Sequence, residues 1–304
     1  MKLETKLTRF DGQVAIVTGA ARGLGRAHAL GLAARGAKVL VSDLGEAGSP
    51  SEAAQSVAAE IVAAGGTALA NAADVADPAA AQAAVRQALD AWGRIDILVN
   101  NAGILRDKSF ANMETEDFDR VIAVHLRGTA HFTRAAWGSM RDQKYGRVVF
   151  TSSASGIYGN FGQANYGAAK AAMIGLMNVL HLEGAKYDIR VNTLVPSAAT
   201  DMTRTLLPAE ALALLAPENV TPAVLFLCGP DAPSRTILSA GAGVFNVTHI
   251  QEGPGLFLSP ADRTPEGIAA NWAAISARDA LQDMGNALAQ TQKFIELAMA
   301  HGAK

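Results

Sequence analysis

Residues 14–25 read VAIVTGAARGLG, and this stretch decides the fold. The first four residues are a short apolar strand, and a helical pattern runs from 26 to 35. The glycines between them allow a tight turn and a close approach of the backbone to a pyrophosphate at the positive end of the helix. The order of strand, turn and helix favours a dinucleotide cradle over a purely structural turn, although three residues separate the first two glycines. The predicted contacts are Gly19, Arg22, Gly23, Leu24 and Gly25.

The second apolar strand indicates which dinucleotide binds. Residues 38–42 read KVLVS and end at Asp43. A carboxylate at this place can accept hydrogen bonds from both hydroxyls of the adenine ribose, and it repels a 2′-phosphate. We therefore expect NAD rather than NADP. Two alternatives stay open, since Asp43 can simply cap a turn, and Arg22 can pair with either a 2′-phosphate or the pyrophosphate.

Two further strands end in polar residues. Residues 69–73 predict a third strand that leads to the adenine edge, and residues 95–99 predict a fourth that runs into NNAG at 100–103. The asparagines can pin the strand end, and the glycine lets the backbone pass beside the cofactor, although Asn-Asn is also a common turn. The predicted contacts here are Asp74, Val75, Asn101, Ala102 and Gly103.

The residues that can carry acid/base chemistry lie in NYGAAK at 165–170. Tyr166 and Lys170 are four residues apart, so they share one face of a helix. The ammonium group would lower the pKa of the phenol from about 10 towards neutrality, so that it can exchange a proton with an alcohol. Ser153 follows the apolar run 147–150, at the strand end where such sheets bind ligands. Its hydroxyl can hold the same substrate oxygen, or it can only shape a turn.

In this order the segments resemble the short-chain dehydrogenase/reductase family, and Ser153 precedes Tyr166 by the usual 13 residues. Longer strings, such as TSSASGIYGNFGQANY at 151–166, are similar to the (3R)-hydroxyacyl-CoA dehydrogenase domains of peroxisomal multifunctional enzymes. The resemblance covers nearly the whole chain, without the hydratase and sterol-carrier domains, so we expect a stand-alone dehydrogenase. It implies that Tyr166 takes the hydroxyl proton, Ser153 holds the oxygen, and Lys170 lowers the Tyr166 pKa and binds the nicotinamide ribose. Tyr166 is then also a cofactor contact.

The chain departs from the wider family at two positions. His125 stands where the family usually has a catalytic asparagine that helps to hold a water. The narrower subfamily that this chain resembles also looks to carry histidine at this position. An imidazole can serve the same water with a charge that varies near neutral pH, or it can simply pack on a helix. After Pro196, a predicted nicotinamide contact, Ser197 replaces the usual glycine and Thr200 comes one position early.

The alternation of strands and helices predicts an α/β fold, a Rossmann-type doubly wound parallel sheet of about seven strands, the last at 244–248. We assign residues 1–258 to this NAD-binding domain and 259–304 to a helical carboxyl-terminal extension. The extension should contain a helix that starts at 264–266 and an amphipathic run at 281–299. The family resemblance implies that helices at 114–142 and 162–186 pack across a two-fold axis, giving a homodimer or homotetramer.

Composition excludes several function classes. The net charge of −2 and the lack of basic runs among aromatics argue against nucleic-acid binding. No charged start precedes a long apolar run, so neither a signal peptide nor a membrane span is expected. The single cysteine, Cys228, permits no internal disulfide and favours a cytoplasmic location. The six scattered histidines predict no metal site.

The leading hypothesis from the sequence is an NAD-dependent oxidoreductase that oxidises a (3R)-hydroxyacyl-CoA to the ketone. One alternative is a dehydrogenase or reductase of hydroxysteroids or other carbonyl compounds, and another is a non-catalytic NAD-binding protein. A coenzyme A thioester carries phosphates, so its cleft needs cations near the mouth. The candidates are Arg106, Lys108 and Arg204, each of which can also be ordinary surface charge.

Overall fold

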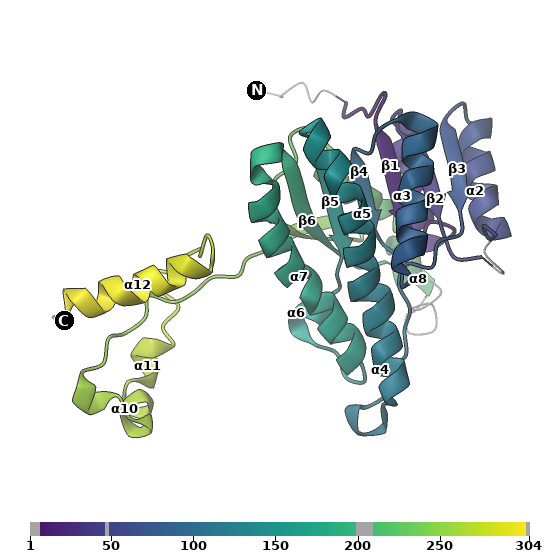
Figure 1. The fold of residues 1–304 in the computed structure, drawn as a ribbon. Coiled ribbons are helices and arrows are strands. Elements are labelled where there is room, and N and C mark those ends of the chain that lie inside the picture. The colour runs from purple at the N-terminus through teal and green to yellow at the C-terminus, as the bar shows by residue number, and fades with distance from the viewer. Residues whose placement is uncertain (1–6, 46–48, 199–208, 302–304) are drawn as a thin grey trace. The chain divides into compact units, whose positions relative to one another are not determined.

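The computed structural model describes residues 7–45, 49–198 and 209–301. Its centre is an eight-stranded sheet in the order β3-β2-β1-β4-β5-β6-β7-β8, with helices on both faces (Figure 1). Neighbouring strands are parallel except β7 and β8, which are antiparallel. The strands are β1 (Val14–Thr18), β2 (Lys38–Ser42), β3 (Thr67–Asn71), β4 (Ile97–Asn100), β5 (Gly146–Thr151), β6 (Ile189–Pro196), β7 (Ile237–Gly241) and β8 (Val244–Thr248). The doubly wound α/β fold predicted from the sequence is confirmed.

The described helices alternate with the strands, singly or in pairs, as far as β7, and three more follow β8. They are α1 (Gly23–Ala34), α2 (Glu52–Ala63), α3 (Pro78–Trp92), α4 (Thr115–Ile122), α5 (Gly128–Gln143), α6 (Ala154–Tyr158), α7 (Ala164–Gly184), α8 (Ala209–Leu214), α9 (Thr221–Cys228), α10 (Pro265–Ala270), α11 (Trp272–Ile275) and α12 (Ala287–Ala300). Local chemistry fixes several starts. Ser51 accepts a hydrogen bond from the Ala54 N–H ahead of α2, and Asp77 caps α3, which has proline at its first position.

Two apolar cores lie on opposite faces of the sheet. Successive residues of a strand point to opposite faces, so Ala15 and Val17 of β1 pack with α1, α2 and α9, whereas Val14 and Ile16 pack with α3, α5 and α7. Both sets are fully buried. This double cover explains why the central strands are continuous apolar runs rather than alternating ones.

The strand order reverses between β1 and β4. The chain goes outward from β1 to β2 and β3, then returns to place β4 on the other side of β1. At such a switch point the loops after the strands separate and leave a crevice at the carboxyl ends. The loops after β1 and β4 carry the glycine-rich turn and the NNAG segment. The fold therefore brings the predicted cofactor residues to one edge of the sheet.

A wide helical turn interrupts the long helix predicted at 114–142. The chain passes from α4 through a π-helical turn, Ala123–Arg127, directly into α5. Such π turns bulge one residue out of the regular ladder, and they are frequent at functional sites. His125 lies at the centre of this turn and is buried.

The end of the sheet differs from the sequence expectation by one strand. The segment predicted as the seventh strand is the eighth, and it runs antiparallel to β7, which the sequence analysis missed. Ala242 and Gly243 join the two strands with φ of 51° and 78°. Two central residues with positive φ are typical of a tight hairpin turn. Because β8 runs antiparallel to β7, the hairpin can join the two strands without the crossover that parallel strands need.

Residues 249–304 form a second compact unit, His249–Lys304, which begins ten residues earlier than the predicted extension. Thr264 caps α10 as the sequence suggested. The second long helix, α12, starts at Ala287 rather than 281, because Asn286 supplies its cap and Gln282 pairs with Glu252 in an isolated bridge. Membership of this unit in the same domain stays a prediction. No helix in the described part of the chain is long and apolar enough to cross a membrane.

Candidate active site

The glycine-rich turn after β1 leaves no room for side chains at two positions. A Cβ atom on Gly19 would lie 2.7 Å from the Cα of Ala102, and one on Gly25 would lie 2.1 Å from the Gly19 carbonyl oxygen. Gly19 and Gly23 also have positive φ, of 64° and 52°. Arg22 is the N-cap of α1, and its exposed side chain makes no capping hydrogen bond. The amino end of α1 is therefore bare backbone next to an exposed cation, which suits an anion.

Thr18 joins the turn to the loop after β4, a role that the sequence analysis missed. Its hydroxyl accepts hydrogen bonds from the backbone N–H groups of Asn101 (3.0 Å) and Ala102 (3.1 Å). The Asn101 amide donates in return to the carbonyls of Thr18 and Gly19, both at 3.1 Å. Asn101 and Ala102, two of the predicted cofactor contacts, thus lie against the glycine turn. The partners are 83 residues apart in the chain, so no local pattern could have shown the contact.

Asp43 lies at the other side of the turn. Its Oδ2 accepts a hydrogen bond from the Ala21 N–H at 2.9 Å. One carboxylate oxygen therefore holds the glycine turn, and Oδ1 has no such bond to it. This position, at the end of β2 and beside the turn, is the one expected for a ribose ligand.

Asp74 makes two contacts within the protein that the sequence analysis did not predict. Its Oδ1 accepts from the Ala76 N–H at 2.9 Å, and its Oδ2 lies 3.3 Å from the Arg120 guanidinium on α4. The strand before it, β3, ends at Asn71 rather than 73, so Asp74 lies in the following loop. Val75 is buried and packs against Gly128 at the start of α5.

Ser153, Tyr166 and Lys170 meet beyond the end of β5. Ser153 is the N-cap of α6, and its Oγ accepts from the Ser155 N–H at 3.2 Å. The Ser153 side chain lies close enough to the Tyr166 phenol to lower the pKa of Tyr166. The Lys170 Nζ lies 5.5 Å from the centre of the Tyr166 ring and donates to the Thr151 carbonyl at 2.5 Å. The three predicted catalytic residues therefore converge.

Close packing of α6 on α7 keeps this cluster together. A Cβ on Gly156 would lie 2.7 Å from backbone and side-chain atoms of Lys170 and Ala171. The Ser152 hydroxyl donates to the Lys170 carbonyl at 2.7 Å from the end of β5. Neither Gly156 nor Ser152 was predicted as a site residue. Both residues contact Lys170 at its backbone or Cβ and so fix its position on α7.

The electrostatics of the pair differ from the sequence expectation. Burial raises the pKa of Tyr166 above its ordinary value, and Asp107 raises it further against the effect of Ser153. Burial also lowers the pKa of Lys170 to about 7. The predicted fall in the Tyr166 pKa is thus wrong. The reason is that Lys170 is only 4% exposed, and burial disfavours its positive charge.

His125 lies edge-on to Tyr166, with ring centres 5.2 Å apart and planes at 87°. Its Nε2 lies 3.0 Å from the Ile104 nitrogen and 2.8 Å from the Ile104 oxygen, and its buried Nδ1 has no hydrogen-bond partner among the described residues. Burial and Lys170 lower the pKa of His125 to about 3. The expectation of a charge that varies near neutral pH is therefore wrong. Gly103 must be glycine here, because a Cβ would lie 2.4 Å from the imidazole.

The last predicted positions lie at the end of β6 and in the loop after β4. Pro196 ends β6 and pairs with Ala240 of β7, and the Ser197 N–H donates to Ala240 at 2.8 Å. Thr200 and Arg204 lie outside the described residues. Arg106 and Lys108 both approach one carboxylate, Asp117 of α4, at 3.6 and 3.3 Å. Their combined charge is thereby partly neutralised.

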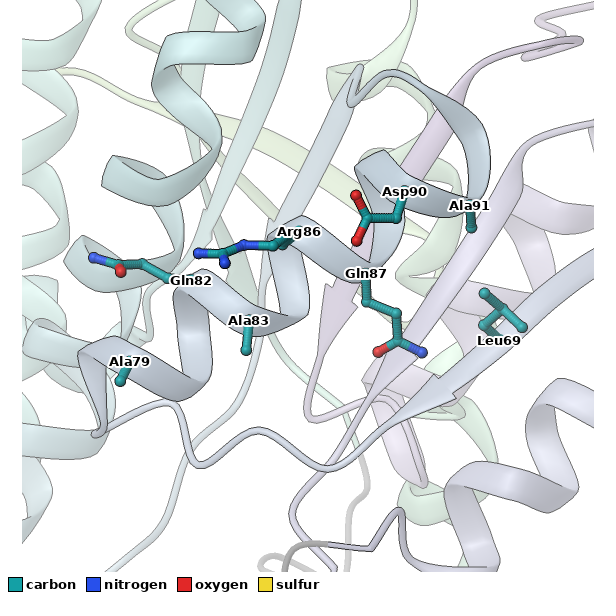
Figure 2. Close-up of a pocket in the computed structure, with 8 residues that line it drawn as sticks. All are labelled: Leu69, Ala79, Gln82, Ala83, Arg86, Gln87, Asp90 and Ala91. Carbon is teal, nitrogen blue, oxygen red and sulfur yellow. The ribbon is translucent and has the colours of Figure 1, made fainter.

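A hollow of about 740 Å³ lies away from these residues, on the outer side of α3 (Figure 2). It is lined by Leu69, Ala79, Gln82, Ala83, Arg86, Gln87, Asp90 and Ala91. Gln87 there donates to the Ala70 carbonyl at 3.3 Å and accepts from the Asn71 amide at 2.7 Å. It thus covers polar groups at the edge strand β3, where an open edge invites strand pairing. Among the described residues no group of three or more acids, histidines or cysteines can hold a metal ion.

A doubly wound sheet with a glycine turn at the switch point and a Ser-Tyr-Lys cluster beside it defines a class, the nicotinamide-dependent oxidoreductases. Residues 13–211 match the family model described as short chain dehydrogenase. The chain therefore belongs to the short-chain dehydrogenase family. It is an oxidoreductase that acts on CH–OH groups with a nicotinamide cofactor.

Three similar proteins show which members of the family this chain resembles. Peroxisomal multifunctional enzyme type 2 of Mus musculus is 48% identical over 87% of this chain and 36% of its own length. A short-chain type dehydrogenase/reductase of Mycobacterium tuberculosis is 46% identical, over 87% of this chain and 94% of that one. The structure of the full-length Drosophila melanogaster peroxisomal multifunctional enzyme type 2 superposes with a TM-score of 0.81 at 36% identity, covering 96% of this chain and 50% of that one. The chain thus spans only part of several of its relatives.

These relatives correct the expected location. Proteins from mouse, Dictyostelium discoideum, Neurospora crassa and Saccharomyces cerevisiae, 43–48% identical to this chain, are named as peroxisomal enzymes. The cytoplasmic expectation is therefore wrong. It rested on the single cysteine, and cysteine usage reports the redox state of a compartment without identifying the compartment.

Proposed function

We propose that the chain oxidises the 3-hydroxyl of a (3R)-hydroxyacyl-CoA to the ketone with NAD. The observation that carries this proposal is the contact of Ser153 with Tyr166, beside Lys170, in a chain 48% identical to a peroxisomal multifunctional enzyme. A non-catalytic NAD-binding protein would need none of these three side chains together. In the proposed oxidation, each of the three side chains has a role.

The cradle for the cofactor fits a dinucleotide. Gly19 and Gly25 leave the backbone bare where a Cβ would fill the turn, and α1 begins directly behind it. Asp43 would accept from the adenine ribose, which supports NAD over NADP. A solved 7α-hydroxysteroid dehydrogenase complexed with NADH has a TM-score of 0.71 and 31% identity, covering 77% of this chain and 95% of that one. When bound, the nicotinamide supplies the hydride acceptor.

Side chains of the protein accept and transfer the hydroxyl proton of the substrate. Ser153 holds the substrate oxygen by a hydrogen bond, and Tyr166 takes the hydroxyl proton. Lys170, with a pKa of about 7, exchanges that proton onward, and it binds the nicotinamide ribose. When the Nε2 of the neutral His125 carries the proton and donates to the Ile104 carbonyl, its buried Nδ1 is an acceptor for a hydrogen bond from a water. Neutrality does not prevent this role, since a relay needs an acceptor rather than a charge.

The acyl-CoA assignment depends on cations at the cleft mouth. Arg106 and Lys108 share Asp117, so the three groups keep one net positive charge near the loop after β4. A phosphate of coenzyme A can compete with Asp117 for them. By analogy with the resembled family, we propose that α4, α5 and α7 form the interface of a homodimer or homotetramer.

One observation favours a second candidate. The 7α-hydroxysteroid dehydrogenase noted above is complexed with 7-oxo glycochenodeoxycholic acid as well as NADH, so a hydroxysteroid is a competing substrate class. The test is NADH formation, followed by absorbance, across a panel of (3R)-hydroxyacyl-CoAs, their (3S) isomers, hydroxysteroids and simple alcohols. We expect turnover with (3R)-hydroxyacyl-CoAs. Activity confined to steroids would overturn the acyl-CoA assignment and leave the alcohol chemistry standing.

A further inference from the structure

The start of the catalytic helix is held by a glutamine with an unusually complete set of hydrogen bonds. Gln163 is the N-cap residue of α7, three residues before Tyr166, yet its side chain does not cap the helix. Its Oε1 accepts from the Ser155 hydroxyl at 2.7 Å and from the Asn160 amide at 3.1 Å. Its Nε2 donates to the Asp107 carboxylate at 2.7 Å. Three of the four hydrogen bonds that an amide can make are present.

The carboxylate determines how this amide is oriented. An ionised carboxylate only accepts hydrogen bonds, so the Gln163 atom that faces Asp107 must be the nitrogen. The oxygen is then left to Ser155, whose hydroxyl must donate. Asp107 thereby fixes one orientation of a side chain that could otherwise rotate by half a turn at little cost.

Other contacts join the same two segments. The Lys108 N–H donates to the Gly162 carbonyl at 3.0 Å, and the Asn165 amide donates to the Arg106 carbonyl at 2.9 Å. The loop after β4 therefore lies along the start of α7 on both sides of Asp107. Asp107 supplies the one charged group in this contact.

The network reaches both sides of the reacting centre. Ser155 donates its backbone N–H to the Ser153 Oγ, and its hydroxyl to Gln163. Gln163 in turn accepts, through its backbone carbonyl, the first helical hydrogen bond of α7, from the Gly167 N–H at 2.7 Å. A chain of hydrogen bonds thus runs from Ser153 through Ser155 to the residue that starts the Tyr166 helix, and Asp107 anchors it.

We propose that Asp107 is a positioning residue, whose carboxylate orients Gln163 and, through Ser155, sets the separation between Ser153 and Tyr166. The role rests on the proposed function, since it requires that Ser153 and Tyr166 act on one substrate oxygen. A displacement of about 1 Å between such groups can cost roughly 100-fold in rate.

Asp107 also acts on Tyr166 through its charge. The groups that face Tyr166 are Lys170 on its own helix, the neutral His125 from the π turn, Ser153 from the end of β5, and Asp107 from the loop after β4. Asp107 is the one that raises the pKa of Tyr166 by its negative charge. Removal of this charge should move the pH profile of turnover to lower pH. Loss of a purely structural contact would leave the profile in place.

A swap of donor and acceptor tests the proposal. Q163E sets two carboxylates against each other and should lower kcat roughly 100-fold, with little change in NADH binding. Adding D107N supplies an amide that donates to the new carboxylate, while Ser155 and Asn160 can still donate to it. The double variant should recover at least roughly 10-fold of the loss. D119N, an exposed carboxylate on α4, is the matched control and should change neither kcat nor the profile.

Three single variants complete the test, each checked for folding by thermal melting. D107A should lower kcat more than it alters the KM for the alcohol. D107N alone keeps an acceptor for Gln163, so its kcat should stay within a few fold of wild type while its profile moves to lower pH. D107A with wild-type kcat, an unmoved D107N profile, or a double variant as slow as Q163E would each overturn the proposal. A wild-type protein that turns over no alcohol would instead overturn the proposed function, and the positioning role with it.

Discussion

Lys170→Met should abolish turnover and yet make the folded protein more stable at neutral pH. Lys170 is only 4% exposed, and burial lowers its pKa from 10.5 to about 7. The folded state therefore binds the proton of this amine more weakly than the unfolded state does. An apolar side chain of similar length removes that cost, and with it the group that is proposed to pass the proton of Tyr166.

The sign and size follow from proton linkage. A base with a lowered pKa in the folded state destabilises folding fully below the folded pKa, near 7, and the cost vanishes above the unfolded pKa, near 10.5. The full shift corresponds to about 5 kcal/mol, and to about 4 kcal/mol at pH 7. In the variant the Thr151 carbonyl loses the hydrogen bond that Lys170 donates, which costs about 1–3 kcal/mol. The net gain for Lys170→Met at pH 7 is therefore about 1–3 kcal/mol.

Urea unfolding followed by circular dichroism at pH 7 and pH 9, at one protein concentration, measures this difference. Wild-type stability should rise between these values by about 2 kcal/mol through this amine, and the advantage of Lys170→Met should shrink by the same amount. Lys144→Met, at an exposed position, is the control and should show no such change. An advantage of equal size at both pH values would refute the assignment of a depressed Lys170 pKa.

The remaining predictions concern turnover and binding. Tyr166→Phe should keep NADH binding while turnover falls by about two to four orders of magnitude, and retained turnover in initial-rate assays would remove Tyr166 from the mechanism. Asp43→Ala should weaken NAD binding, measured by titration, by roughly 1.5–3 kcal/mol and improve relative use of NADP; a wild type that prefers NADPH would contradict this. His125→Asn should leave the pH profile of kcat unchanged between pH 5 and 8, because the pKa of His125 is about 3, and a titration step lost near pH 6.5 would show that the imidazole is charged in that range. Arg106→Glu should raise KM for a hydroxyacyl-CoA but not for the same acyl group on a short neutral thioester, and added salt should partly mask the effect.

The fold was predictable because its signals are local. The apolar strands, the glycine-rich turn and the capped helices each lie within about a dozen residues, and α/β alternation then leaves few topologies. The missed strand β7, Ile237–Gly241, is a short segment with a serine and a glycine, and β6 supplies its parallel partner. Its pairing depends on residues more than 40 positions away, so the sequence alone favoured β8, whose two valines, phenylalanine and threonine are residue types enriched in strands.

The residues of the candidate site were predictable, but their electrostatics were not. The helical spacing of Tyr166 and Lys170 correctly placed both on α7. It could not show that Lys170 turns to the Thr151 carbonyl, or that Asp107 approaches Tyr166 from another loop. Spacing along a helix defines which side chains are neighbours. Burial and distant charges decide what those neighbours do to a pKa.

The two pKa shifts together indicate which group of the pair holds a proton. Burial and Asp107 raise the pKa of Tyr166, so the phenol keeps its proton near pH 7, while burial lowers the pKa of Lys170 to about 7. In this pair Tyr166 is therefore a protonated phenol, which can donate a proton, rather than a phenolate that can accept one from an alcohol. Oxidation then requires Tyr166 to lose its proton before it takes that of the substrate, and Lys170, 5.5 Å from the centre of the Tyr166 ring, is a titratable group that can receive it. The buried amine is costly for folding, and this is the function that would account for its retention.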